Sequence, residues 1–174
     1  RTASARTLRE GLLGLQRHLT SGTTKVREDS ILWLRLMYLA SLAEAGRSAG
    51  IACFFEHPAD PARYCKTVKG ADKCASIWPQ RFFKAWSQEM GLDLDEFDQC
   101  TKGQLVAKTT GLANNLGLGW HGQWCDHENR HQDVQIADSK ELSRYPWEMM
   151  LGLAEGICSK VRKSQEARLA TAPV

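Results

Sequence analysis

The sequence predicts a layered α/β fold of about three strands with flanking helices. Apolar residues recur at helical spacing in four segments of the chain, which predicts four helices. A continuous apolar run at 51–55 is typical of a strand covered on both faces, as in a parallel sheet. Two further strand patterns, 92–99 and 106–114, are joined by a turn at 101–103. Because strands and helices alternate along the chain, a layered α/β architecture follows.

Length and charge narrow the class of protein. The chain has 174 residues, which suits one domain, and its 23 Lys and Arg against 20 Asp and Glu give a formal charge of +3. This near balance disfavours a strongly electrostatic nucleic-acid binder. The longest apolar run, Ile31–Ala43, falls short of the roughly 20 residues that a spanning helix needs, so we expect no transmembrane segment. The chain starts at Arg1 without a signal-peptide pattern, so we expect an intracellular fragment or processed form, organellar if the N-terminus is processed.

The chain is predicted to divide into an N-terminal extension, 1–22, and a main domain, 23–174. Four leucines at spacings of four, three and four predict an amphipathic helix within the extension, and they are Leu8, Leu12, Leu15 and Leu19. A second helix is predicted over 24–47. It carries two apolar stripes, so we expect it to pack on more than one side.

Two more helices follow the apolar strand. The first is predicted with Ser76 near its N-cap and Gly91 past its end. The second starts at Pro146, and we expect it to turn one apolar face inward. The residues expected on that inward face are Trp147, Met150, Leu151, Ala154, Ile157, Cys158 and Val161.

A loop rich in histidine is the best candidate for a metal site. The expected ligands are Cys125, His127 and His131, with His121 or Cys100 as the fourth. Sulfur and imidazole ligands in tetrahedral geometry suit Zn²⁺. Acidic residues in the same loop leave a solvated surface loop as the alternative. The six cysteines are expected to be reduced, as is usual inside cells, although Cys65 and Cys74 share a loop and can pair in an oxidising compartment.

Five motifs together resemble a known family. In chain order they are FFEHPADP, SIWPQRFFKAW, FDQCTKG, AKTTGLANNL and SRYPWEMMLGLAEG. From about Thr24 onward, this succession resembles the C-terminal half of a cytosine-C5-methyltransferase-like domain, of the kind found in retroelement-derived polyproteins of algal protists. The resemblance implies a partial Rossmann-like fold, as in class I methyltransferases that use S-adenosylmethionine.

The resemblance also implies roles for individual residues. Glu56 sits where the family's Glu steadies the target cytosine, and a buried carboxyl group can do this by hydrogen-bonding a ring nitrogen. His57 replaces the Asn that usually follows. Lys108, Thr109 and Thr110 lie on the strand where the family carries Arg residues near the substrate.

The family's cofactor loop and nucleophile are missing from this sequence. The Gly-rich loop and the Pro-Cys motif belong upstream of the matched part, and none of the six cysteines follows a proline. We therefore expect a noncatalytic structural or accessory protein, with no cofactor of its own and with protein partners in a larger assembly. An algal origin implied by the resemblance points to an organellar or photosynthetic complex. The alternative is a fragment of a DNA cytosine-C5 methyltransferase-like enzyme, which would bind S-adenosylmethionine and nucleic acid once an upstream half is supplied.

Overall fold

The computed structural model describes residues 24–45, 51–64, 76–106, 108–126, 131 and 144–171. The chain forms two compact units, which are taken separately below. Unit 1 consists of Arg1–Gly46 and Ala59–Met90, and unit 2 of Arg47–Pro58 and Gly91–Val174. The predicted helix within 1–22 lies outside the described residues.

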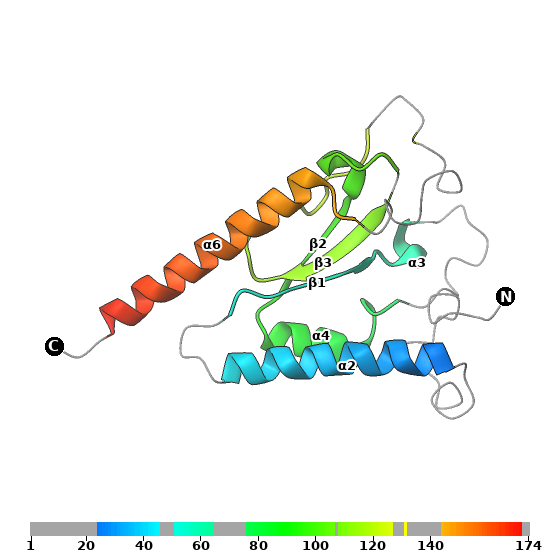
Figure 1. The fold of residues 1–174 in the computed structure, drawn as a ribbon. Coiled ribbons are helices and arrows are strands. Elements are labelled where there is room, and N and C mark those ends of the chain that lie inside the picture. The colour runs from blue at the N-terminus through cyan, green and yellow to red at the C-terminus, as the bar shows by residue number, and fades with distance from the viewer. Residues whose placement is uncertain are drawn as a thin grey trace. The chain divides into compact units, whose positions relative to one another are not determined.

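Unit 1 is helical in its described part. Its elements are α2 (Thr24–Ala45), the short α3 (Pro61–Tyr64) and α4 (Arg81–Glu89) (Figure 1). Phe83 of α4 is buried between two tryptophans, with its ring centroid 6.4 Å from that of Trp33 and 5.3 Å from that of Trp78. The indole N–H of Trp86 donates a 2.9 Å hydrogen bond to Ser41 Oγ of α2. An aromatic cluster thus holds α4 against α2.

The helices of unit 1 differ in detail from the sequence prediction. α4 begins five residues after Ser76, with Gln80 as its N-cap, because the segment before it is buried in an irregular conformation. Gly91 follows the helix at a φ of 61°, which confirms the predicted stop. The expectation that α2 packs on more than one side is wrong. Among its described side chains, those of 31–45, Met37 is the buried apolar one, whereas Tyr38 and Leu39 are among six large apolar residues that are exposed.

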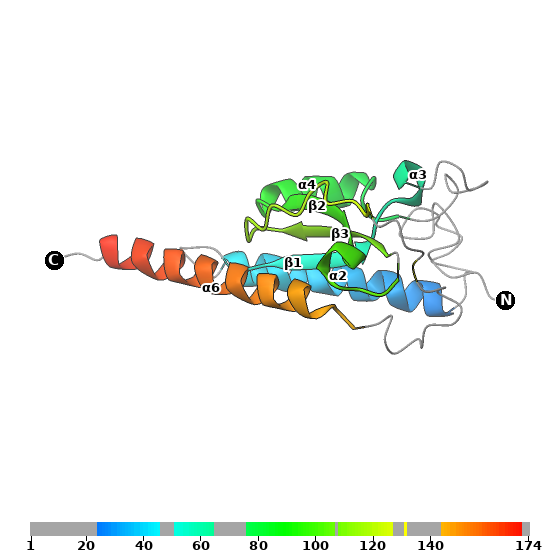
Figure 2. The same cartoon turned by 90° about the horizontal axis from the view of Figure 1, so that it is seen from above.

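Unit 2 is built on a three-stranded sheet. Its strands are β1 (Phe54–Pro58), β2 (Asp93–Asp98) and β3 (Thr109–Asn114), and they lie in the order β1-β3-β2. Both outer strands pair antiparallel to β3. The 3-10 helix η3 (Gln99–Lys102) joins β2 to the segment before β3, and α6 (Trp147–Ala170) runs alongside the sheet (Figures 1 and 2).

The sheet confirms the α/β class but not a Rossmann-like order. The paired strands 92–99 and 106–114 form as predicted, and η3 takes the place of the simple turn. The apolar strand begins at Phe54, three residues later than predicted, and the expected parallel pairing is wrong. The more completely buried strand is β3, in which five of six residues are buried, and it takes the central place between β1 and β2.

The core of unit 2 lies between the sheet and α6. It contains Phe97, Leu112, Leu116, Trp120, Met149 and Leu153, all buried. The expected inward face of α6 is wrong for every residue except Ile157. Trp147 is 67% exposed and Val161 44% exposed, whereas Met149 and Leu153 point inward. This helix has two apolar faces, and the one that carries glycines packs inward.

Two glycines explain that choice of face. An added Cβ at Gly152 would lie 2.5 Å from Cζ2 of Trp120, and one at Gly156 would lie 2.9 Å from Cδ2 of Leu118. Only a helix face without side chains at these two positions can approach the loop so closely. Among the described residues, no helix has the length and apolar character needed to cross a membrane.

Candidate functional site

Unit 2 brings together two groups of chemically reactive side chains. The first, called the carboxylate cluster below, consists of Glu56, Lys108 and Tyr145. The second, called the Cys/His cluster, consists of Cys100, Cys125 and His131. Each group combines predicted residues with one further residue. That residue is Tyr145 in the first group and, in the second, Cys100, which was one of two choices for the fourth ligand.

The register of β1 and β3 assembles the carboxylate cluster. Glu56 lies opposite Leu112, and Lys108 precedes Leu112 by four residues. Because side chains alternate between the two faces of a strand, residues an even number apart share a face. The Nζ atom of Lys108 therefore comes within 3.4 Å of Glu56 Oε1, and the two side chains are 27% and 15% exposed. The sheet thus joins two residues that the resemblance placed near a substrate.

Tyr145 completes the carboxylate cluster from the segment before α6. Its hydroxyl donates a 3.4 Å hydrogen bond to Glu56 Oε2. Burial, followed by the nearby charge of Glu56, raises the pKa of Tyr145 to about 12. Glu56 Oε1 has no hydrogen-bond partner among the described residues, so its contact with Lys108 is an ion pair without hydrogen-bond geometry. Tyr145 lies in the motif SRYPWEMMLGLAEG, but its contact with Glu56 was not predicted, because 89 residues separate the two.

The other residues implied by the resemblance lie elsewhere in the sheet. His57 is the next residue along β1, so its side chain points to the opposite face, where it is buried. The hydroxyl of Thr109 donates a 2.5 Å hydrogen bond to Asp98 Oδ1. The hydroxyl of Thr110 accepts a 2.8 Å hydrogen bond from the side-chain amide of Gln99. Both threonines therefore tie β3 to β2 and η3.

The Cys/His cluster combines two sulfur atoms and one imidazole. Its three potential ligand atoms all lie within 4.8 Å of one another, and Cys125 Sγ is 2.9 Å from Nε2 of His131. Cys100 is buried in η3, while the other two side chains are half-buried. The group can hold a metal ion.

Backbone hydrogen bonds fix the loop that carries Cys125. The N–H of Gly122 donates to the carbonyl of Glu96 at 2.9 Å, and the N–H of Asp98 donates to the carbonyl of Gln123 at 3.0 Å. The loop therefore lies along β2. The Asp98 carboxylate continues this attachment, since its Oδ2 accepts a 2.9 Å hydrogen bond from the N–H of Cys125. Because Cys100 follows Asp98 by two residues, the two cysteines are brought to the same end of β2.

The protonation of Cys100 depends on these neighbours. Burial raises its pKa to about 11, and the nearby sulfur of Cys125 and charge of Asp98 act in the same direction. The free thiol therefore keeps its proton at neutral pH. A metal ion binds the thiolate, so it would have to displace that proton.

The remaining predicted metal ligands are placed differently. His121 lies outside the Cys/His cluster, and its Nδ1 accepts a 3.3 Å hydrogen bond from the backbone N–H of Glu96. His127 lies outside the described residues. Cys100, which the sequence analysis gave as one of two choices for the fourth ligand, is a member of the cluster.

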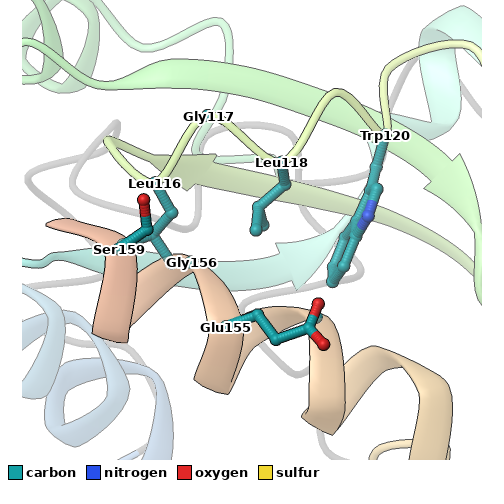
Figure 3. Close-up of a pocket in the computed structure, with 8 residues that line it drawn as sticks. Leu116, Gly117, Leu118, Trp120, Glu155, Gly156 and Ser159 are labelled. Atoms are coloured by element: carbon teal, nitrogen blue, oxygen red, sulfur yellow. The ribbon is translucent and has the colours of Figure 1, made fainter.

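A cavity of about 280 Å³ lies between α6 and the loop that precedes His121 (Figure 3). Its lining residues are Leu116, Gly117, Leu118, Trp120, Gly152, Glu155, Gly156 and Ser159. Figure 3 shows Leu118 pointing from the loop towards α6. Neither cluster contributes to this lining. Gly152, Glu155 and Gly156 belong to the motif SRYPWEMMLGLAEG, but the sequence did not predict a cavity there.

The fold and the two clusters define a small α/β protein with a candidate metal centre. No protein family, no curated protein and no solved structure matches this chain. Its function must therefore be inferred from the chemistry of its own residues.

Proposed function

We propose that this chain is a noncatalytic structural or accessory protein of methyltransferase-like ancestry, which works inside the cell through protein contacts in a larger assembly. The observation that carries the proposal is an exposed apolar stripe along α6. The stripe consists of Trp147, Leu151, Ala154, Cys158 and Val161, all exposed. Their spacings alternate between four and three residues, which is the heptad pattern of helices that pair side by side.

Charges beside the α6 stripe favour a second copy of this chain as the occupant. Glu148 and Glu155 lie in the N-terminal half of α6, whereas the basic residues Lys160, Arg162 and Lys163 lie in its C-terminal half. Two copies of such a helix attract each other when they run antiparallel, because each acidic half then faces a basic half. In the register that places Leu151 opposite Val161 and Ala154 opposite Cys158 of the other copy, the apolar stripe meets itself and Glu148 lies near Arg162 twice.

Oligomeric state tests this proposal. Sedimentation equilibrium at about 10 to 100 μM should show a dimer, since weak specific contacts have dissociation constants in the micromolar range. Val161→Glu should yield a monomer because it places a charge in the apolar stripe. Arg162→Glu should weaken the dimer about tenfold or more, and adding Glu148→Arg should restore it.

The matched control is Lys163→Glu, which changes the charge of α6 by the same amount as Arg162→Glu at an exposed position on the side of the helix away from the stripe. It should leave the dimer intact. A monomeric wild type over this concentration range, or a charge swap that fails to restore pairing, would overturn the proposed contact.

The carboxylate cluster supports a noncatalytic role. A catalytic Glu must reach its substrate, but the Glu56 carboxylate contacts Lys108 and Tyr145 of its own unit. Because the sequence lacks the family's Gly-rich cofactor loop, calorimetric titration of the chain with S-adenosylmethionine should give no heat of binding. Tight binding of this cofactor would contradict the proposal.

A second candidate is favoured by one specific observation. The resemblance placed Glu56 and Lys108 near one substrate, and their side chains lie 3.4 Å apart. The candidate is a fragment of a DNA cytosine-C5 methyltransferase-like enzyme with a partial Rossmann-like fold, in which Tyr145 and Lys108 release the carboxylate when a base binds. It requires S-adenosylmethionine and an upstream half that supplies the cofactor loop and the nucleophile. Transfer of a labelled methyl group to cytosine by that longer chain, abolished by Glu56→Gln, would establish it.

A further inference from the structure

We propose that Cys100, Cys125 and His131 bind one Zn²⁺ ion and that this ion fastens the segment of 120–126, together with His131, to the end of β2. This inference concerns the Cys/His cluster alone. It does not depend on the proposed function, because neither the α6 stripe nor the carboxylate cluster contributes a ligand.

The distances within the Cys/His cluster fit a tetrahedral ion after small movements. With Zn–S bonds of about 2.3 Å and Zn–N bonds of about 2.0 Å, ligand atoms in a tetrahedral site lie roughly 3.5 to 3.8 Å apart. The three atoms of this cluster lie within 4.8 Å of one another, and the shortest separation is the 2.9 Å between Cys125 Sγ and His131 Nε2. Shifts of about 1 Å or less are therefore enough to admit the ion.

The choice of ligands selects the metal. Two thiolates and an imidazole form a soft donor set that suits Zn²⁺ and disfavours Mg²⁺ or Ca²⁺, which prefer oxygen ligands. No carboxylate belongs to this group among the described residues.

Asp98 supports the cluster without being one of its ligands. Asp98 accepts the backbone N–H of Cys125 at 2.9 Å and the hydroxyl of Thr109 at 2.5 Å, so both of its oxygens are engaged. Hydrogen bonds from a residue that does not itself bind the metal orient the metal ligands and restrict their movement. Asp98 therefore acts as a positioning residue that presents Cys125 towards Cys100.

Cobalt substitution tests the site directly, with the full chain purified under reducing conditions. After dialysis, zinc-loaded protein should retain about one zinc ion per chain, as measured by elemental mass spectrometry. Co²⁺ in place of Zn²⁺ should give intense visible bands, which indicate tetrahedral geometry, and a near-ultraviolet band from thiolate ligands. Cys100→Ser and Cys125→Ser should each remove about half of the thiolate band and weaken Zn²⁺ binding more than the 10- to 100-fold typical of changes to such supporting residues.

Two variants distinguish the site from general effects on the protein. Cys53→Ala removes a thiol of unit 2 that lies outside the Cys/His cluster and should change neither the spectrum nor the affinity for zinc. Asp98→Asn keeps the size of the side chain and should weaken zinc binding about 10- to 100-fold while the thiolate band keeps its intensity.

Three results would overturn the zinc proposal. The first is a wild type that retains no zinc after dialysis. The second is a Cys100→Ser variant that binds zinc as tightly as the wild type while its circular dichroism is unchanged. The third is a disulfide between Cys100 and Cys125 that persists in the presence of a reductant.

Discussion

At the scale of single residues, Glu56 shows how tertiary contacts redefine a motif. Sequence alone presents it as a carboxylate at the end of an apolar strand. In the structure its two oxygens face Lys108 and the hydroxyl of Tyr145. A carboxylate in such surroundings stabilises its own unit, and its contribution depends on the protonation of its neighbours.

Tyr145 gives a prediction for alkaline pH. Its pKa in the folded chain is about 12, raised above the ordinary value of 10.0, so its stabilising contribution is complete below pH 10 and is lost as the pH rises through about 12. We expect Tyr145→Phe to make the free energy of unfolding depend less on pH between pH 10 and 12. Because the side chain is only half-buried, the wild type should lose about 1 to 2 kcal/mol more unfolding free energy over this pH range than the variant does. Urea unfolding between pH 9 and 12 measures it.

Glu56→Gln provides the control for this assignment. It removes the charge that helps to raise the pKa of Tyr145 but leaves the burial, which is the larger cause. The pKa of Tyr145, followed by phenolate absorbance, should therefore fall while staying above 10.0. An unchanged pKa in this variant would show that Glu56 does not act on Tyr145.

At the scale of secondary-structure elements, α6 determines how unit 2 is closed. Its glycine-bearing face packs against the loop that carries Trp120, and its other apolar face is exposed. Helical spacing is compatible with either face, and the face predicted to point inward is the exposed one. The sequence pattern contains no information on which of them meets the sheet, because that choice depends on the space available next to Trp120.

Replacement of Gly152 tests this packing. In an exposed helix, Gly→Ala stabilises by about 1 kcal/mol, because alanine has the higher helix propensity. Here the new Cβ would lie 2.5 Å from the indole of Trp120, so we expect Gly152→Ala to destabilise the protein by about 1 to 3 kcal/mol. Thermal unfolding measures the change.

The control is Glu166→Ala at an exposed position of the same helix, where a change within about 0.5 kcal/mol is expected. If Gly152→Ala raised the unfolding temperature, α6 could not approach the loop as closely as the structure places it.

At the scale of the whole molecule, the chain consists of two compact units with different means of stabilisation. Aromatic contacts around Phe83 hold the described helices of unit 1. Unit 2 has a small sheet, one covering helix and the Cys/His cluster. Any ligand that binds the folded state of one unit should therefore stabilise that unit first.

Hydrogen exchange with and without Zn²⁺ tests this division. At free zinc about 100 times its dissociation constant, binding adds about 2.7 kcal/mol to the stability of the state that binds it. We expect slower exchange in β2, η3 and β3, with no change in α2 and α4. Equal protection of both units would show instead that they unfold together.

Local features of the fold followed from the sequence, and long-range ones did not. The bounds of α2, the start of α6, the stop at Gly91 and the hairpin of β2 and β3 depend on neighbours in the chain, so periodicity and turn residues predicted them. The antiparallel pairing of β1 joins segments about fifty residues apart, and an apolar run alone does not specify its partner.

The candidate metal centre combines both kinds of information. The sequence by itself determined which residue types are available, a cysteine and histidines in one loop with Cys100 upstream. Only the tertiary structure decided that Cys100 is a member and that His121 lies outside the group. The physical reason is the hydrogen bonding of the loop to β2 and Asp98, which fixes where Cys125 lies and which side chains can reach it.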